Sequence, residues 1–263
     1  MRPKKIKALQ TLNIFSFILM IVVNALANAL PIAGKNTGEV SALYPSLFTP
    51  AGFTFSIWGV IYLLLFIFVI YQARGLFGKA NELISKLVTQ IGIWFFISCL
   101  ANTSWILVWH HQMISASVLI MMVILFSLIK IYLNLRIGKS TESSNLNYLI
   151  QIPFSVYLGW ITVGTIANVS IFLINIGWKG FGLSPDFWTV LVIGTATAIT
   201  ILTLINRNDI FFSLVILWAF FGIIFKRIAV SDEPFQIIII SLVIGMVLIF
   251  GMVVCTLMRR FTK

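Results

Sequence analysis

The sequence predicts an all-α membrane protein, folded as a polytopic bundle of about eight transmembrane helices. Two observations carry this prediction. The chain of 263 residues is 60% hydrophobic and only 10% charged, whereas soluble domains carry about 25% charged residues. Its apolar residues are also gathered in runs close to the roughly 20 residues that a helix needs to cross a bilayer. Since the alternation of a membrane β-barrel is absent, we expect every span to be helical.

Short polar connections separate the apolar runs. The first run follows a basic segment at 1–11 that we assign to a cytoplasmic N-terminus. Its alanine-rich end imitates a signal-peptide cleavage site, but the run continues through Pro31, which favours a retained span. The seventh run is the shortest. The predicted spans lie at about 12–33, 53–73, 87–109, 113–135, 148–176, 187–206, 209–226 and 235–258.

The basic residues predict the orientation in the lipid bilayer. Most of the 18 Lys and Arg residues fall in the N-terminal segment, in every second connection and in the C-terminal tail. Only Lys35, Lys179, Lys226 and Arg227 fall in the other connections. The positive-inside rule therefore predicts a multi-pass protein of the plasma membrane with both termini in the cytoplasm. Because the basic residues are scattered and form no patch, the net charge of +11 does not indicate nucleic acid as a partner.

Several kinds of chemistry have no residues to carry them. No Asp, Glu, Lys or Arg lies deep in a predicted span, which weighs against a proton-driven carrier, and no phosphate loop, HExxH or GxSxG motif is present. Cys99 and Cys255 fall inside apolar runs, so we expect buried, reduced thiols. We expect His110 and His111 to be exposed turn residues, and we predict no metal site because partner ligands are missing.

The connection at 34–52 is the longest on the outer side of the predicted bundle. It is too apolar for a plain solvated loop, since it contains Tyr44, Leu47 and Phe48. Two interpretations stay open: a lid over the mouth of the bundle, or a loop with its aromatic side chains in the headgroup region. We expect no helix in this connection, because of its residues Gly34, Gly38, Pro45, Pro50 and Gly52.

Aromatic residues open the second span. Trp58 and Tyr62 are four residues apart, so they share one face of a helix. A span that faces only lipid needs Leu, Ile and Val. An indole and a phenol on one face therefore indicate either an interfacial anchor or the wall of a binding pocket. Asn24 and Asn28 form a polar stripe on the first span in the same way, and we expect this stripe to face the bundle.

Three separated motifs together resemble the TspO/MBR family, known as tryptophan-rich sensory proteins, translocator proteins or peripheral benzodiazepine receptors. The resemblance covers residues 12–176 and implies a five-helix core, which leaves 177–263 as a segment of three further helices. The sequence departs from the family at Tyr44, where the lid of the family carries an indole, and in a shorter spacing between Phe55 and Trp58. The motif residues are Phe55, Trp58 and Tyr62 in the second span, Asn102 and Trp105 in the third, and Tyr157, Trp160 and Asn168 in the fifth.

The resemblance implies a pocket between the first, second and fifth helices under the 34–52 lid. Members of the family bind tetrapyrroles, and some bind sterols, so a porphyrin or haem is implied as a ligand and no resident cofactor is expected. Trp58 and Trp160 occupy the positions of two indoles that face the porphyrin. A homodimer is also implied, without a defined interface. The implied ligand-binding residues are Tyr44, Phe48, Phe55, Trp58, Tyr62, Asn102, Trp105, Tyr157, Trp160 and Asn168.

We therefore expect a membrane receptor or sensor that binds a hydrophobic, planar small molecule, and we assign no catalytic residue. Two alternatives stay open: a permease, facilitative or part of an ATP-driven exporter, and an enzyme that degrades porphyrins under light. Polar groups inside the spans cost energy in lipid when they are unpaired. We thus expect Asn102, Thr162 and Asn168 to bond another helix or the ligand.

Overall fold

The computed structural model describes residues 3–30, 32–77, 82–139, 145–230 and 236–261. Over these ranges the chain consists of helices and turns, with no β-strand. Three short 3-10 turns are η1 (Ile32–Gly34), η2 (Gly52–Ser56) and η3 (Gly180–Gly182). The α-helices are α1 (Pro3–Ala29), α2 (Thr37–Ala42), α3 (Ile57–Phe77), α4 (Glu82–Ile91), α5 (Trp94–His110), α6 (Ile114–Asn134), α7 (Asn145–Asn175), α8 (Pro185–Arg207), α9 (Ile210–Val230) and α10 (Gln236–Phe261).

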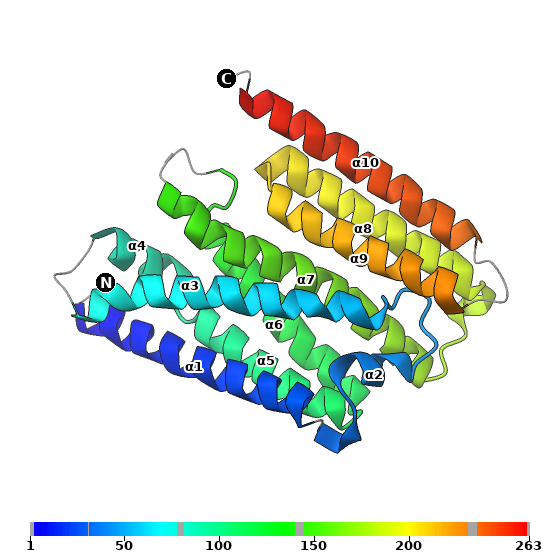
Figure 1. Cartoon of the computed structure of the whole chain (residues 1–263), viewed down its shortest axis with the longest axis horizontal. Helices are drawn as coiled ribbons and strands as arrows, with labels where there is room; N and C mark the ends of the chain where they lie inside the picture. The colour runs from blue at the N-terminus through cyan, green and yellow to red at the C-terminus, as the bar shows by residue number, and fades with distance from the viewer. Residues whose placement is uncertain (1–2, 31, 78–81, 140–144, 231–235, 262–263) are drawn as a thin grey trace.

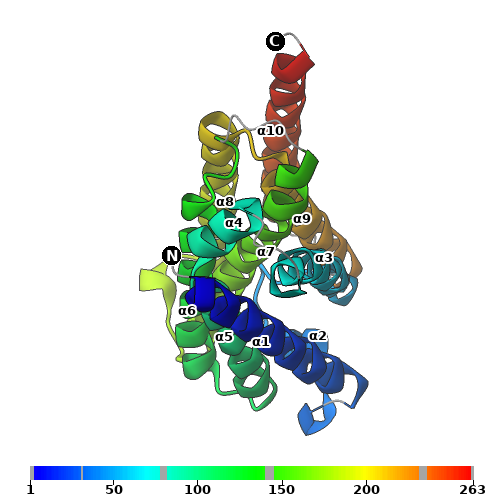
Figure 2. The same ribbon diagram turned by 90° about the vertical axis from the view of Figure 1, so that its left-hand side faces the viewer.

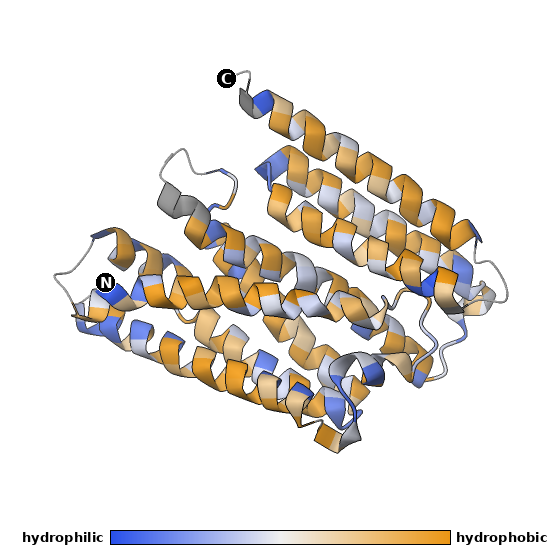
Figure 3. Ribbon diagram, viewed as in Figure 1, coloured by the Kyte–Doolittle hydropathy of each residue, from blue (hydrophilic) through white to orange (hydrophobic). Residues whose placement is uncertain are grey.

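The predicted polytopic helix bundle is confirmed. In the described ranges, seven helices are long and apolar enough to cross a membrane, and α4 with α5 makes an eighth span when the bent pair is counted as one. Apolar residues cover the middle of these helices, and hydrophilic residues gather toward their ends (Figure 3). The seventh span is longer than the sequence suggests, because α9 has 21 residues.

The third span begins earlier than predicted and is bent. Its two parts, α4 and α5, meet at an angle of 52°. Gly92 ends α4 with φ +59, and its N–H donates to the Val88 carbonyl at 2.9 Å. A left-handed glycine is the common way to end a helix. The predicted span at 87–109 therefore lacks the first turn of a membrane segment that starts at Glu82.

Five long helices close a ring in which each contacts two neighbours, in the order α1, α5, α6, α7 and α3. The last three helices pack on one another, and α9 joins this group to the ring through α7. Figures 1 and 2 show α8, α9 and α10 on one side of the ring, with α10 farthest out. Both termini lie at one end of the bundle and α2 at the other (Figure 1), as an even number of spans requires.

Three phenylalanine rings fill the middle of the ring of helices. Phe68 of α3 meets Phe95 of α5 and Phe154 of α7 edge to face, with centroids 5.2 and 5.1 Å away. All three side chains are fully buried. Phe68 follows Trp58 by ten residues, which places it about 15 Å farther along α3. This plug limits how deep any cavity at the α2 end can reach.

The 34–52 connection contains a helix, so the prediction of no helix there is wrong. Asn36 begins α2 with a capping box: its side chain accepts from the Glu39 N–H at 2.9 Å, and its own N–H donates to the Glu39 carboxylate at 2.8 Å. Such a cap contributes about 1 kcal/mol. It offsets the cost of Gly38 inside the helix, which is also about 1 kcal/mol.

The end of this connection is fastened to the C-terminal helices. The Ala51 N–H donates to the Gly222 carbonyl of α9 at 3.0 Å, and the Trp218 indole donates to the Thr54 carbonyl at 3.0 Å. A Cβ atom on Gly222 would lie 2.0 Å from the Thr54 hydroxyl oxygen. The close approach of η2 to α9 therefore requires glycine at this position.

A buried carboxylate ties α9 to the ring at the opposite end. Asp209 is 4% exposed, and one of its oxygens accepts from the Phe212 N–H at 3.1 Å, which caps α9. The other oxygen accepts from the Tyr132 hydroxyl of α6 at 2.9 Å and the Ser155 hydroxyl of α7 at 2.7 Å. Side chains of three helices thus meet at one buried carboxyl group, which is the first residue of the predicted span at 209–226.

Replacing Asp209 with Ala is expected to lower the free energy of unfolding by about 3 kcal/mol, because it removes a helix cap and leaves two buried hydroxyl donors without an acceptor. Asp209→Asn keeps an acceptor oxygen and is expected to lose less. Thermal unfolding in detergent, followed by circular dichroism, measures both. Equal midpoints for Asp209→Ala and the wild type would contradict this role.

Gly222→Ala is expected to lower the free energy of unfolding by about 1–3 kcal/mol, because the added methyl overlaps Thr54. Gly194→Ala on α8 is the matched control, since nothing lies within 4 Å of its Cβ position. The same thermal measurement compares the two. A loss in both variants, or in neither, would show that the η2–α9 contact does not depend on the missing Cβ.

Candidate functional site

Aromatic rings from four segments meet around Trp58 at the α2 end of the ring of helices. The Trp58 ring stacks on Tyr62 with centroids 5.4 Å apart, and it meets Trp160 of α7 edge to face at 6.3 Å. Trp105 of α5 lies 6.5 Å away. Edge-to-face and offset pairs of this kind each contribute about 0.5–1.5 kcal/mol beyond area burial. The cluster consists of Phe55, Trp58, Tyr62, Trp105, Tyr157 and Trp160.

A cavity of about 370 Å³ lies directly under α2, and we call it the lid chamber. One wall is polar and comes from α1 and from the start of α2. The facing wall is aromatic and comes from η2 and α3. The lining residues are Asn24, Asn28, Asn36, Thr37, Gly38, Gly52, Phe55, Ser56, Trp58, Tyr62 and Ile106.

A smaller cavity of about 40 Å³ lies behind Phe55 and Trp58, and we call it the tryptophan chamber. Its lining residues are Ser41, Phe55, Trp58, Trp105, Trp109, Met121, Trp160, Ile161, Gly164, Ala167, Asn168 and Ile171. Phe55 and Trp58 line both chambers. These two side chains therefore form a common wall between the two chambers.

One polar group at the tryptophan chamber has no partner. Trp105 is 5% exposed, and its buried indole nitrogen has no acceptor among the described residues. An unpaired buried donor costs about 1–3 kcal/mol. The chamber exceeds the roughly 10–15 Å³ that a water needs, so a water or a ligand acceptor atom has room to accept this hydrogen bond.

A chain of hydrogen bonds fixes the helices around the chambers. The Asn24 amide of α1 donates to the Asn102 side-chain oxygen of α5 at 2.8 Å. The Asn102 amide in turn lies 3.1 Å from the Tyr157 hydroxyl of α7. Asn102 and Tyr157 are fully buried. Since these groups pair with each other, Asn102 and Tyr157 position the walls and line neither chamber.

The end of α5 fastens α2 over the lid chamber. The Trp109 indole donates to the Thr37 carbonyl at 3.2 Å. His110 Nδ1 lies 3.2 Å from the Ile32 carbonyl oxygen, and its Nε2 lies 3.2 Å from the Thr37 hydroxyl. A carbonyl only accepts, so Nδ1 carries the proton and Nε2 is free to accept from Thr37. His110 is 1% exposed. The expectation of an exposed turn residue is therefore wrong for His110 and right for His111.

The ten predicted ligand-binding residues divide into three groups. Phe55, Trp58, Tyr62, Trp105, Trp160 and Asn168 line the two chambers. Asn102 and Tyr157 lie behind the walls. Tyr44 and Phe48 lie apart from both chambers: Phe48 lines a separate cavity near α8, and Tyr44 is half-buried. Burial raises the pKa of the Tyr44 phenol, so this side chain is neutral at physiological pH.

Several lining residues are absent from the predicted set. Trp109 follows Trp105 by four residues, which places both on one face of α5, so its position was readable from spacing. Asn36 and Glu39 match the capping-box pattern that begins a helix. Asn24 and Asn28, predicted to face the bundle, both line the lid chamber. Ser56 carries no local signal, because its place depends on how η2 packs on α9.

Other expectations about polar residues in the spans have mixed outcomes. Asn168 bonds Ser117 of α6 at 3.0 Å, as expected for contact with another helix. Thr162 instead donates to the Leu158 carbonyl of its own helix at 2.8 Å. Cys99 is buried and Cys255 is exposed on α10, so the prediction of two buried thiols is wrong for Cys255; both are free. Among the described residues, no group of three His, Cys, Asp or Glu side chains is placed to hold a metal.

Comparison with models of known protein families identifies a family for this chain. The family model described as TSPO-like protein matches residues 10–255. No curated protein and no solved structure matches this chain. The matched region includes α8, α9 and most of α10, which the motif-based comparison leaves outside the five-helix core. Because the match covers nearly the whole sequence, and because the three motifs meet in one aromatic cluster, the chain belongs to the TSPO-like protein family.

Proposed function

We propose that this protein is a membrane receptor or sensor that binds a planar, hydrophobic ligand of the tetrapyrrole class in the lid chamber. The observation that carries the proposal is the meeting of Trp58, Tyr62 and Phe55 on one wall of a cavity beneath α2. Flat conjugated molecules gain about 0.5–1.5 kcal/mol for each well-placed aromatic contact. Three aromatic residues within eight positions of the chain supply such contacts on one wall.

The size and polarity of the lid chamber support this ligand class. Its volume of about 370 Å³ lies within the roughly 300–1,000 Å³ range of small-molecule sites. The tryptophan chamber adds space behind Phe55 and Trp58. The wall opposite the aromatic rings carries the Asn28 amide. It donates one N–H to the Asn24 carbonyl at 2.9 Å, and its second N–H suits a polar substituent at the edge of a flat ring.

A light-dependent reaction is the second candidate, favoured by the density of indoles. Trp58, Trp105 and Trp160 all line the tryptophan chamber. The ring centroids of Trp105 and Trp160 lie 6.5 and 6.3 Å from that of Trp58. A photoexcited macrocycle in the lid chamber would contact Trp58 and lie close to the two indoles behind it. This candidate requires covalent change of the ligand, whereas a receptor releases it unchanged.

Titration of the purified protein with protoporphyrin in the dark tests the proposed site. Trp58→Phe and Trp160→Phe are each expected to weaken binding about two- to tenfold, because the first removes an indole contact with the ligand and the second removes the ring that supports Trp58 edge to face at 6.3 Å. Absorption of the porphyrin and tryptophan quenching report the affinity. Trp94→Phe is the matched control, since Trp94 packs on Phe126 and lines neither chamber.

Saturable binding that is weakened in the two site variants and kept in the control supports the receptor. Equal affinity in all four proteins, or no saturable binding, contradicts the site. Repeating the titration under light separates the two candidates. Bleaching of the bound porphyrin that is slowed in Trp58→Phe favours the enzyme, and recovery of intact porphyrin favours the receptor.

The capping box of α2 is expected to control how long the ligand stays bound. Glu39 is exposed and lines neither chamber, so Glu39→Ala removes its half of the cap without touching the ligand. A loss of up to about 1 kcal/mol in α2 is expected to raise the dissociation rate about two- to fivefold. Glu39→Gln keeps the acceptor and is expected to release ligand at the wild-type rate. A stopped-flow chase measures these rates, and equal rates for Ala and Gln would show that α2 is not the barrier.

A further inference from the structure

A third cavity lies at the same end of the bundle, on the side of the C-terminal helices, and we call it the α7–α8 cavity. Its volume is about 260 Å³. It is bounded by residues 45–48 of the 34–52 connection, which we call the lid segment, by the last turns of α7, by the α7–α8 connection and by the first turns of α8. It shares no lining residue with the lid chamber or the tryptophan chamber. It is therefore a separate space.

One wall of this cavity is held in place by the backbone of the connection. Trp178 and Trp188 face each other with ring centroids 5.0 Å apart. The Trp188 indole donates to the Gly180 carbonyl at 3.0 Å. Gly180 has φ +61, and a Cβ there would lie 2.9 Å from the indole nitrogen. The connection is thus shaped to hold the Trp188 ring in this position.

The interior of the cavity suits an apolar occupant. Phe48, Leu173 and Val192 contribute apolar surface. The two hydroxyls in the α7 and α8 walls are already satisfied, because Ser170 donates to the Ile166 carbonyl at 2.9 Å and Thr189 donates to the Pro185 carbonyl at 2.8 Å. Polar atoms of a ligand would find few free donors inside, whereas a hydrocarbon chain would lose contact with water.

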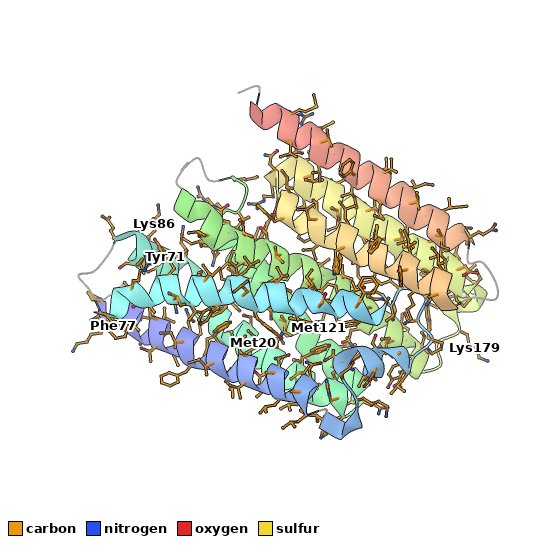
Figure 4. All side chains as sticks on the ribbon, in the orientation of Figure 1. Met20, Tyr71, Phe77, Lys86, Met121 and Lys179 are labelled. Atoms are coloured by element: carbon orange, nitrogen blue, oxygen red, sulfur yellow. The ribbon has the colours of Figure 1, made fainter. Side chains whose placement is uncertain are left out.

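The rim of the cavity carries a positive charge. Lys179 is the one charged residue of the lining, and its side chain points away from the helix ends (Figure 4). It forms no ion pair with any acidic residue of the described chain. A lysine at the end of membrane helices keeps its ammonium at headgroup depth while its stem covers apolar surface. The cavity therefore pairs an apolar interior with a cation at its edge.

We propose that the α7–α8 cavity binds a single-chain amphiphile with an anionic head group, of the long-chain fatty acid type. The acyl chain lies between Phe48 and the Trp178–Trp188 pair, and the carboxylate lies at Lys179. The volume of about 260 Å³ is small beside the roughly 300–1,000 Å³ of most ligand sites, so the cavity encloses part of one acyl chain more readily than the two chains of a phospholipid. The ligand would contact residues 45–48 of the same connection that carries α2 over the lid chamber.

Tryptophan quenching by dibromostearate tests the proposal. The full-length protein is placed in nanodiscs of phosphatidylcholine, and the brominated acid is added stepwise. We expect a saturable component of quenching on top of a non-saturable component from acid dissolved in the bilayer. The saturable component is expected to disappear in a variant with both Trp178→Phe and Trp188→Phe, because bromine quenches indoles at contact.

Lys179 provides the test of the head group. Lys179→Gln is expected to weaken binding of the acid about two- to fivefold, the range for an exposed ion pair, and Lys179→Glu is expected to weaken it further. The methyl ester of the same acid is expected to bind wild type and Lys179→Gln equally. Lys35→Gln is the matched control, since Lys35 lies in the lid segment and lines none of the three cavities.

Each remaining outcome overturns the proposal. Quenching without a saturable component shows that the acid only dissolves in the bilayer. Equal affinity of wild type and Lys179→Gln for the acid shows that the Lys179 ammonium does not bind the carboxylate. Displacement of the acid by an equal mole fraction of an anionic two-chain phospholipid shows that the site takes a bilayer lipid and not a single-chain acid.

Discussion

The hydrogen-bonded chain of Asn24, Asn102 and Tyr157 joins three helices of the ring through buried side chains. In lipid an amide or phenol without a partner costs several kcal/mol, so α1, α5 and α7 cannot slide or rotate independently. The walls that carry Trp58, Trp105 and Trp160 are set by this constraint. Asp209 imposes the same constraint on α6, α7 and α9 at the other end, which is why eight spans form one body.

The two main chambers differ in the residue types that line them. Amides and hydroxyls of α1 and α2 lie on one side of Phe55 and Trp58, and indoles of α5 and α7 lie on the other. A ligand seated between them meets hydrogen-bonding groups at its edge and rings at its faces. The fastening of Thr37 by Trp109 and His110 means that access to this space involves α2 more than the long helices.

The parts of this architecture that follow from periodicity and bilayer thickness could be predicted from the sequence. The spans are of this kind because the length of an apolar run predicts them. The shared face of Trp58 and Tyr62 is of this kind because a spacing of four residues predicts it. The helix α2 was not predicted, since Gly38 argued against it while the cap formed by Asn36 and Glu39 decided the outcome. Burial of His110 and the displacement of Phe48 from the chambers depend on the path of the 34–52 segment across the bundle, which no local pattern encodes.

The contact between η2 and Gly222 has a consequence for what counts as the minimal working unit of this TSPO-like protein. Phe55, which separates the two chambers, belongs to a turn whose other side rests on α9. The five-helix ring alone would keep its helices but lose the surface that orients this turn. The last three helices are thus part of the scaffold of the site, and a shorter relative without them must hold the same turn by different means.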